Sequence, residues 1–264
     1  MLNYAHFAGS AALAALAAAA ISCGSVNAPA GVGRDMATFI PADSLLLAGL
    51  NLDEVRASPL YPKLPPAARA LAEPLRDAGY LLLASNGKDI AAIARGRFRE
   101  APPGATLVAP GLAVGGSPDS IRAAIAQHKT GRNGAPDLLA CAASVADGRQ
   151  IWIVTRGGVP LPVTGNAANL NRLLRDTEYA AIGARVGSQI EIEATAVGRS
   201  TEAGREFEER LRAILSLAAA ANARRPDLVA LIRSVLIRRE DRTVRVALSA
   251  GPDAVDPLLR LVPR

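Results

Sequence analysis

Two ordered matches between the halves of the chain constrain its fold more than any other sequence feature. The segment LRDAGYLLLASNGKDIAAIARG at 75–96 matches LRDTEYAAIGARVGSQIEIEATA at 174–196, and PDLLACAASV at 136–145 matches PDLVALIRSV at 226–235. The two matches are offset by about 99 and about 90 residues. We therefore predict two tandem copies of a module of about 100 residues, the first at 36–150 and the second at 151–264.

Each copy is predicted to combine helices with β-hairpins, because short apolar runs alternate with longer helical patterns and turn sequences. The first copy is predicted to contain a strand at 45–53, a helix at 65–78, a hairpin at 80–98, helices at 117–129 and from Pro136, and a closing strand at 149–157. The second is predicted to contain helices at 166–177, 200–223 and 226–234, hairpins at 179–198 and 235–248, and a helix at 253–262. This order predicts an α+β protein with antiparallel sheets rather than a doubly wound parallel fold.

The first 22 residues are typical of an export signal. The chain has no charged side chain before Arg34, and the stretch from Ala8 to Ile21 is almost wholly apolar. A stretch of this length matches the core of a signal peptide and is shorter than the roughly 20 residues that cross a bilayer as a helix. We expect residues 1–22 to be a signal peptide, and 23–35, which contains Gly, Pro, Ser and Asn without periodicity, to be a flexible tether.

Two cleavage sites fit this signal. The sequence from Ala20 to Cys23 resembles the lipobox of bacterial lipoproteins, and this part of the chain is similar to uncharacterised bacterial envelope lipoproteins. That resemblance implies that Cys23 becomes the mature N-terminus and carries a lipid on its thiol. The alternative is ordinary signal peptidase cleavage after Ala28, in the small-residue pattern VNA. In that case Cys23 is discarded.

The charge distribution bears on partners. The formal net charge is +6, and nearly all basic residues are arginines. No run of five or more basic residues occurs, so we expect no nucleic-acid partner. A dispersed basic surface suits a protein held at an anionic membrane through a lipid anchor. Another envelope protein is a further expected partner.

The motifs of common envelope hydrolases are missing from the sequence. Beyond the signal the only histidine is His128, and the sequence holds no CxxC, HExxH, GxSxG or P-loop pattern. We therefore expect no catalytic residues, no metal site and no cofactor, and hence no enzyme. Glu191 and Glu193 share one strand face and could form an acid pair or bind calcium, but the Ile-Glu alternation is typical of a half-exposed strand.

Further candidate residues have an ordinary structural interpretation beside the functional one. Ser117 in GGSPDS opens a helix that could hold an anion, although a simple N-cap is favoured. RREDR at 238–242 is interpreted as a solvated hairpin turn. Cys141 is expected to be a buried inert thiol, with a disulfide to Cys23 as the alternative. A symmetric ligand site between the copies could use the matched residues Arg76, Asp77, Tyr80, Arg175, Asp176 and Tyr179, but a helix end feeding a strand is the plainer interpretation.

The sequence favours an exported, lipid-anchored cell-envelope protein, facing the periplasm or the cell exterior, that acts as a non-catalytic binding or structural module. The alternative is a periplasmic carrier of a ligand or lipid with an apolar cleft between the copies or between helices and sheet. A carboxylate-dependent enzyme is the third interpretation. The three differ in what a structure should show: a carrier needs an apolar cavity, and an enzyme needs acids that converge in a cleft.

Overall fold

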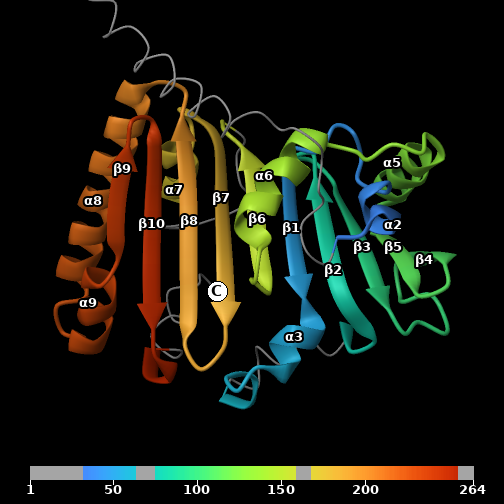
Figure 1. Cartoon of the computed structure of the whole chain (residues 1–264), viewed down its shortest axis with the longest axis horizontal. Helices are drawn as coiled ribbons and strands as arrows, with labels where there is room; N and C mark the ends of the chain where they lie inside the picture. The colour runs from blue at the N-terminus through green and yellow to red at the C-terminus, as the bar shows by residue number, and fades with distance from the viewer. Residues whose placement is uncertain (1–31, 64–74, 159–167, 255–264) are drawn as a thin grey trace, which may run out of the picture.

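The fold is built on one antiparallel sheet of 10 strands (Figure 1). The structure is a computed structural model that describes residues 32–63, 75–158 and 168–254. The strands are β1 (Leu46–Asn51), β2 (Ala78–Ser85), β3 (Ile90–Gly96), β4 (Ala105–Ala109), β5 (Leu112–Gly116), β6 (Ile151–Arg156), β7 (Thr177–Val186), β8 (Ile190–Gly198), β9 (Leu236–Glu240) and β10 (Thr243–Ala250). Their order across the sheet is β4-β5-β3-β2-β1-β6-β7-β8-β10-β9.

Along the chain, helices of different length precede or connect these strands. They are α2 (Arg34–Ala37), α3 (Leu52–Ala57), α5 (Pro118–Lys129), α6 (Pro136–Ala146), α7 (Ala168–Leu173), α8 (Thr201–Ala221) and α9 (Pro226–Arg233), with short 3-10 turns η1 (Tyr61–Lys63) and η4 (Pro252–Ala254). Within the described residues, no helix is long and apolar enough to cross a membrane. The α+β class and the antiparallel pairing are confirmed.

Both halves of the sheet have the same strand order. Counting outwards from the centre, the order is β1, β2, β3, β5, β4 on one side and β6, β7, β8, β10, β9 on the other. The halves meet where β1 pairs antiparallel with β6, so they share one continuous sheet rather than forming separate sheets. A register shift interrupts β2 between Ala78 and Tyr80, and another interrupts β7 between Thr177 and Tyr179.

The two sequence matches have different structural outcomes. The first leads into β2 and β7, which hold equivalent places in the two halves of the sheet. The second covers α6 and α9, which do not: α6 follows the hairpin β4–β5, whereas α9 precedes the hairpin β9–β10. Two tandem copies are expected to place their matched helices at equivalent points of the element order, and α6 and α9 do not meet this expectation.

Helices cover opposite faces of the sheet in its two halves. Ala181 belongs to the main core with Trp152, Val154 and residues of α6, whereas its neighbour Ala180 packs against the cluster that contains Phe207 of α8. Consecutive residues of a strand point to opposite faces, so α6 and α8 lie on different sides. In Figure 1 α8 stands at the β9 end of the sheet and α5 at the β4 end.

The boundaries of most predicted elements agree with the structure. The helices at 117–129, 200–223 and 226–234, the hairpins at 179–198 and 235–248, and the strand at 149–157 are all present within a few residues. The strand predicted over 45–53 ends at Asn51, where α3 begins with the Asn51 side chain accepting a hydrogen bond from the Glu54 backbone. Most of the helix predicted at 65–78 and of the helix at 253–262 lies outside the described residues.

Candidate functional site

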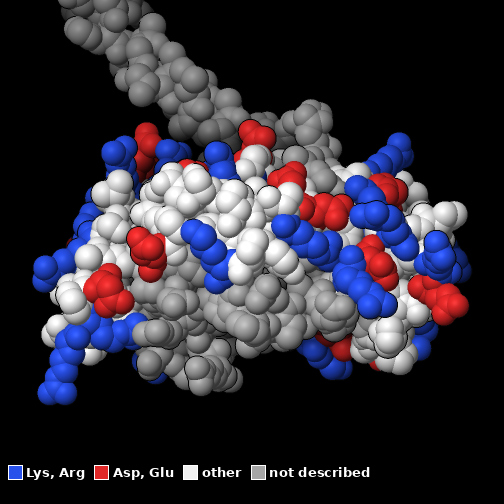
Figure 2. Space-filling view, turned by 90° about the horizontal axis from the view of Figure 1, so that it is seen from below, with Lys and Arg blue, Asp and Glu red and all other residues white. Residues whose placement is uncertain are grey.

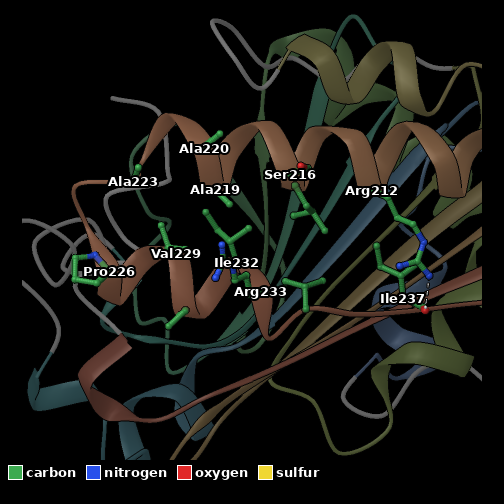
Figure 3. A pocket seen from close by; sticks show the side chains of 13 residues that line it. Arg212, Ser216, Ala219, Ala220, Ala223, Pro226, Val229, Ile232, Arg233 and Ile237 are labelled. Atoms are coloured by element: carbon green, nitrogen blue, oxygen red, sulfur yellow. Dashed lines mark hydrogen bonds between the residues drawn. The ribbon is translucent and has the colours of Figure 1, made fainter.

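An apolar groove lies between α8, α9 and β9 (Figure 3). Its volume is about 780 Å³, and 13 residues line it. These are Arg212, Leu215, Ser216, Ala219, Ala220, Ala223, Pro226, Val229, Ala230, Ile232, Arg233, Val235 and Ile237. Volumes of 300–1,000 Å³ and mostly apolar linings are typical of small-molecule sites, so this groove is the candidate functional site.

The position of α8 is fixed at its N-terminal end. The Ser200 side chain accepts a hydrogen bond of 3.1 Å from the Ala203 backbone, as expected for an N-cap. Gly204 then lets the helix lie against the β9–β10 turn, because a Cβ atom at this position would be 2.8 Å from Cα of Arg242. From there α8 runs on to Ala221, so its last turns form one wall of the groove.

The groove arises because α8 carries small side chains where α9 approaches it. Leu215 packs with Leu228, Leu231 and Ile232 of α9 in a common cluster that closes the bottom of the groove. Further along the chain, Ala219 and Ala220 of α8 and Ala223 in the turn after it face the groove and leave space that larger side chains would fill. In Figure 3 these alanines lie opposite Val229 and Ile232 of α9.

An arginine closes the groove at the β9 end. The Arg212 guanidinium donates hydrogen bonds to the Glu208 carboxylate at 2.9 and 3.1 Å and to the Ile237 backbone carbonyl at 3.2 Å. Glu208 also pairs with Arg239 at 3.0 Å. The hydrogen bond from Arg212 lowers the pKa of the Glu208 carboxyl below its usual range, and Arg212 and Arg239 share this one carboxylate.

A second arginine in the groove has no such partner. Arg233, the last residue of α9, makes no side-chain hydrogen bond or ion pair with the described residues. None of the described residues that line the groove is acidic. Arg233 is exposed, so water solvates its charge when no ligand is bound.

The matched Arg, Asp and Tyr residues do not form a common site. β1 and β6 lie between β2 and β7, and neighbouring strands are about 4.8 Å apart, so Tyr80 and Tyr179 are well separated. Tyr80 is buried and accepts a hydrogen bond of 2.9 Å from Nε1 of Trp152. Asp176 pairs with Arg210 at 3.4 Å on the surface. In the second copy Arg175 and Asp176 lie between the end of α7 and the start of β7, as the helix-end interpretation expects, whereas the helix predicted before Arg76 lies outside the described residues.

The two glutamates of β8 also have separate roles. Glu193 forms an ion pair with Arg149 at 2.5 Å, and Glu191 lies 3.6 Å from Arg185. Each carboxylate is therefore neutralised by its own arginine on an exposed surface, as the half-exposed-strand interpretation requires. Among residues 32–63, 75–158 and 168–254, no group of three or more His, Cys, Asp or Glu side chains could hold a metal ion.

The remaining candidates have structural roles where they are described. Ser117 caps α5 by accepting a hydrogen bond of 3.2 Å from the Ser120 backbone. The His128 ring stacks on Phe39 with centroids 4.0 Å apart, and its Nδ1 lies 2.9 Å from Oγ1 of Thr38. Cys141 is half-buried on α6 beside the main core.

The last two sequence predictions concern the charged segment RREDR at 238–242 and the lipidation site Cys23. Arg238, Arg239 and Glu240 of RREDR belong to β9, and only Asp241, with a φ of 52°, and Arg242 form the turn to β10. The predicted hairpin turn is therefore shorter than the segment. Its charges also join the turn to the rest of the sheet, because Arg242 pairs with Glu178 of β7 at 2.7 Å. Cys23, the predicted lipidation site, lies outside the described residues.

The sequence reasoning missed the groove. It found both helices but not the space between them, since that space depends on how α8 and α9 pack. The run of small residues in SLAAAANA at 216–223 was the available signal. Basic and acidic side chains are interspersed on the face shown in Figure 2, in agreement with the dispersed charge expected from the sequence.

No family model and no curated protein matches the chain. Among solved structures it is similar to three crystal forms of TP0453, a protein of Treponema. Form III has a TM-score of 0.50 and 7% identity, with 88% of this chain and 100% of that chain covered. Form I has a TM-score of 0.49, 7% identity, and coverage of 85% and 96%. Form IV has a TM-score of 0.47, 9% identity, and coverage of 89% and 97%. At such identities the likeness concerns the fold alone.

Proposed function

We propose that this chain is an exported, lipid-anchored envelope protein that acts by binding and not by catalysis, with the groove between α8 and α9 as its binding site. The observation that carries the proposal is the groove itself, whose volume of about 780 Å³ and apolar walls suit a ligand. The glutamates considered for acid catalysis are each paired with a separate arginine instead.

The proposed anchor is a lipid on Cys23, joined to the body of the protein by the tether up to residue 35. It rests on the lipobox-like sequence and on the apolar stretch before it. A lipid anchor would hold the protein at a membrane facing the periplasm or the cell exterior, where an envelope protein is the second partner we propose. Nucleic acid is not a proposed partner, because the basic residues are dispersed.

Membrane partition and intact mass test the anchor. In the native host, the wild-type protein should sediment with membranes and have a mass that includes the lipid, whereas Cys23→Ala should lose both properties. A wild-type protein that stays soluble and begins at Pro29 would show that cleavage follows Ala28 and would refute the anchor.

A ligand carrier is the second candidate function. The same groove favours it, because a carrier needs an apolar cavity with a route to solvent. Native mass spectrometry of the protein purified from its host separates the two functions: a co-purified small molecule supports the carrier, whereas a bound polypeptide supports a module that docks another envelope protein.

We also propose that the body of the protein arose by tandem duplication. The shared strand order and the register shifts before Tyr80 and Tyr179 support this proposal. Because α5 and α6 follow the hairpin β4–β5 whereas α8 and α9 precede the hairpin β9–β10, this proposal requires that one of these two helix pairs changed its place in the element order. Crystal structures in which the five strands of 36–150 fail to superpose on those of 151–264 would contradict the duplication.

A further inference from the structure

We propose that the groove between α8 and α9 binds an anionic amphiphile with a single hydrocarbon chain. The chain would lie between the two helices, and the anionic head would bind the Arg233 guanidinium. This inference rests on the ligand-carrier function proposed for the groove and adds the chemical class of its ligand.

The walls of the groove suit a narrow apolar chain. On one side Ala219 and Ala220 of α8, and Ala223 just after it, carry side chains that project little from the backbone, and on the other side Val229 and Ile232 of α9 are aliphatic. The two helices pack directly through the cluster around Leu231, so the groove is a furrow between touching helices. A docked helix is about 10–12 Å across with its side chains, much wider than a single hydrocarbon chain.

The charge of the groove selects the head group. Arg212 already donates to Glu208 and to the Ile237 carbonyl, so it serves as an end wall. Arg233 is exposed and has no partner among the described residues, and none of the described residues that line the groove is acidic. Figure 3 shows Arg233 in the central part of the groove, beside Ile232. A carboxylate or phosphate there would form charge-assisted hydrogen bonds with the guanidinium while its chain follows the apolar walls.

Neither feature would be sufficient alone. A neutral hydrocarbon would leave the arginine without a counter-charge, and a small anion would leave the apolar walls exposed to water. An amphiphile uses both, and burial of its chain contributes about 0.8 kcal/mol for each CH₂ group removed from water.

Equilibrium binding of palmitate and of its neutral analogue hexadecanol tests the inference. The protein is the full chain with Cys23→Ala, so that no lipid of its own competes for the groove. Ala220→Trp would fill the groove from α8, and Ala221→Trp is its matched control, because the adjacent exposed Ala221 does not line the groove. Arg233→Gln removes the proposed head-group contact, and Arg238→Gln removes an arginine outside the groove.

We expect palmitate to bind more tightly than hexadecanol. Arg233→Gln should weaken palmitate binding about tenfold, as expected for the loss of a charge-assisted contact, and leave hexadecanol binding unchanged. Ala220→Trp should abolish binding of both ligands, while the two control variants should behave as the parent protein. Circular dichroism confirms that each variant is folded, and if Ala220→Trp does not fold, the arginine pair decides the outcome.

The possible failures are distinguishable. Equal binding of palmitate and hexadecanol, or an unchanged palmitate affinity in Arg233→Gln, would overturn the anionic head group but leave an apolar binding groove. No binding of either ligand, or binding that Ala220→Trp does not affect, would overturn the proposed occupant. A protein helix found in the groove by native mass spectrometry and cross-linking would also overturn it. The membrane partition of the wild-type protein decides the anchor independently of these results.

Discussion

The buried pair of Tyr80 and Trp152 should make the stability of this protein depend on alkaline pH. Tyr80 is 6% exposed and Trp152 is 1% exposed, and the phenol oxygen accepts the indole N–H at 2.9 Å. Burial raises the pKa of Tyr80 from 10.0 to about 12, because the ionised phenolate would lose its hydration. The hydrogen bond from Trp152 acts in the opposite direction, but its effect is smaller.

The sign and size of the effect follow from proton linkage. Below pH 10 the tyrosine is neutral in both the folded and the unfolded chain, and its contribution to stability is complete. Between pH 10 and about 12 the unfolded chain releases the proton while the folded chain retains it, so the free energy of unfolding falls as the pH rises. Each pH unit within that window costs about 1.4 kcal/mol, which gives a loss of about 3 kcal/mol by the end of the window.

Tyr80→Phe isolates this effect. At neutral pH the variant should be less stable by about 1–3 kcal/mol, because the buried N–H of Trp152 loses its acceptor. Urea unfolding, followed by circular dichroism and by the fluorescence of Trp152, the only tryptophan, measures both proteins at several pH values. The stability difference should shrink from pH 9.5 upwards and vanish or reverse by about pH 12. A difference that stays constant over this range would refute the reasoning.

Three further predictions concern packing, capping and charge. Gly49→Ala should destabilise the protein by about 1–3 kcal/mol, because the new Cβ atom would lie 2.2 Å from Cε2 of Trp152. Gly187→Ala is the control: its Cβ atom would have no neighbouring atom nearer than 3.9 Å, so urea unfolding should change little. Ser117→Ala should cost about 1 kcal/mol through loss of the α5 cap, measured in the same way. The pKa of the Glu208 carboxyl is lowered, so acid pH should protonate the carboxylate that binds Arg212 and loosen α8. Amide hydrogen exchange of α8 should then become faster. Unchanged protection of α8 at acid pH would contradict this prediction.

Much of the fold could be predicted because local signals mark its elements. Ser117 and Ser200 start α5 and α8 as N-caps, and Pro118 and Pro136 occupy the first helical positions that proline favours. The strand β4, the short helices α2 and α3, and the joining of both halves into one sheet were missed. The pairing of β1 with β6 brings together segments about 100 residues apart, and no local pattern encodes such a contact.

The candidate site was harder to predict because its properties arise from packing. The sequence shows that α8 contains several alanines, but only the position of α9 makes Ala220 line a groove, while Ala219 lines it and also packs against the cluster around Leu231. Likewise, the sequence does not indicate which arginines have partners. Arg212 is paired because Glu208 lies one turn before it, whereas Arg233 ends its helix without an acidic neighbour.

The pairing of β1 with β6 determines whether either half can exist by itself. A chain cut near residue 150 would lose this pairing and expose the backbone donors and acceptors of two central strands as new edges. β1, with the sequence LLAGLN, has no charged side chain to oppose the approach of another strand. Exposed apolar edges of this kind act as templates for strand addition. Each half produced separately should therefore aggregate or associate with its missing partner, so expression trials should keep the two halves on one chain.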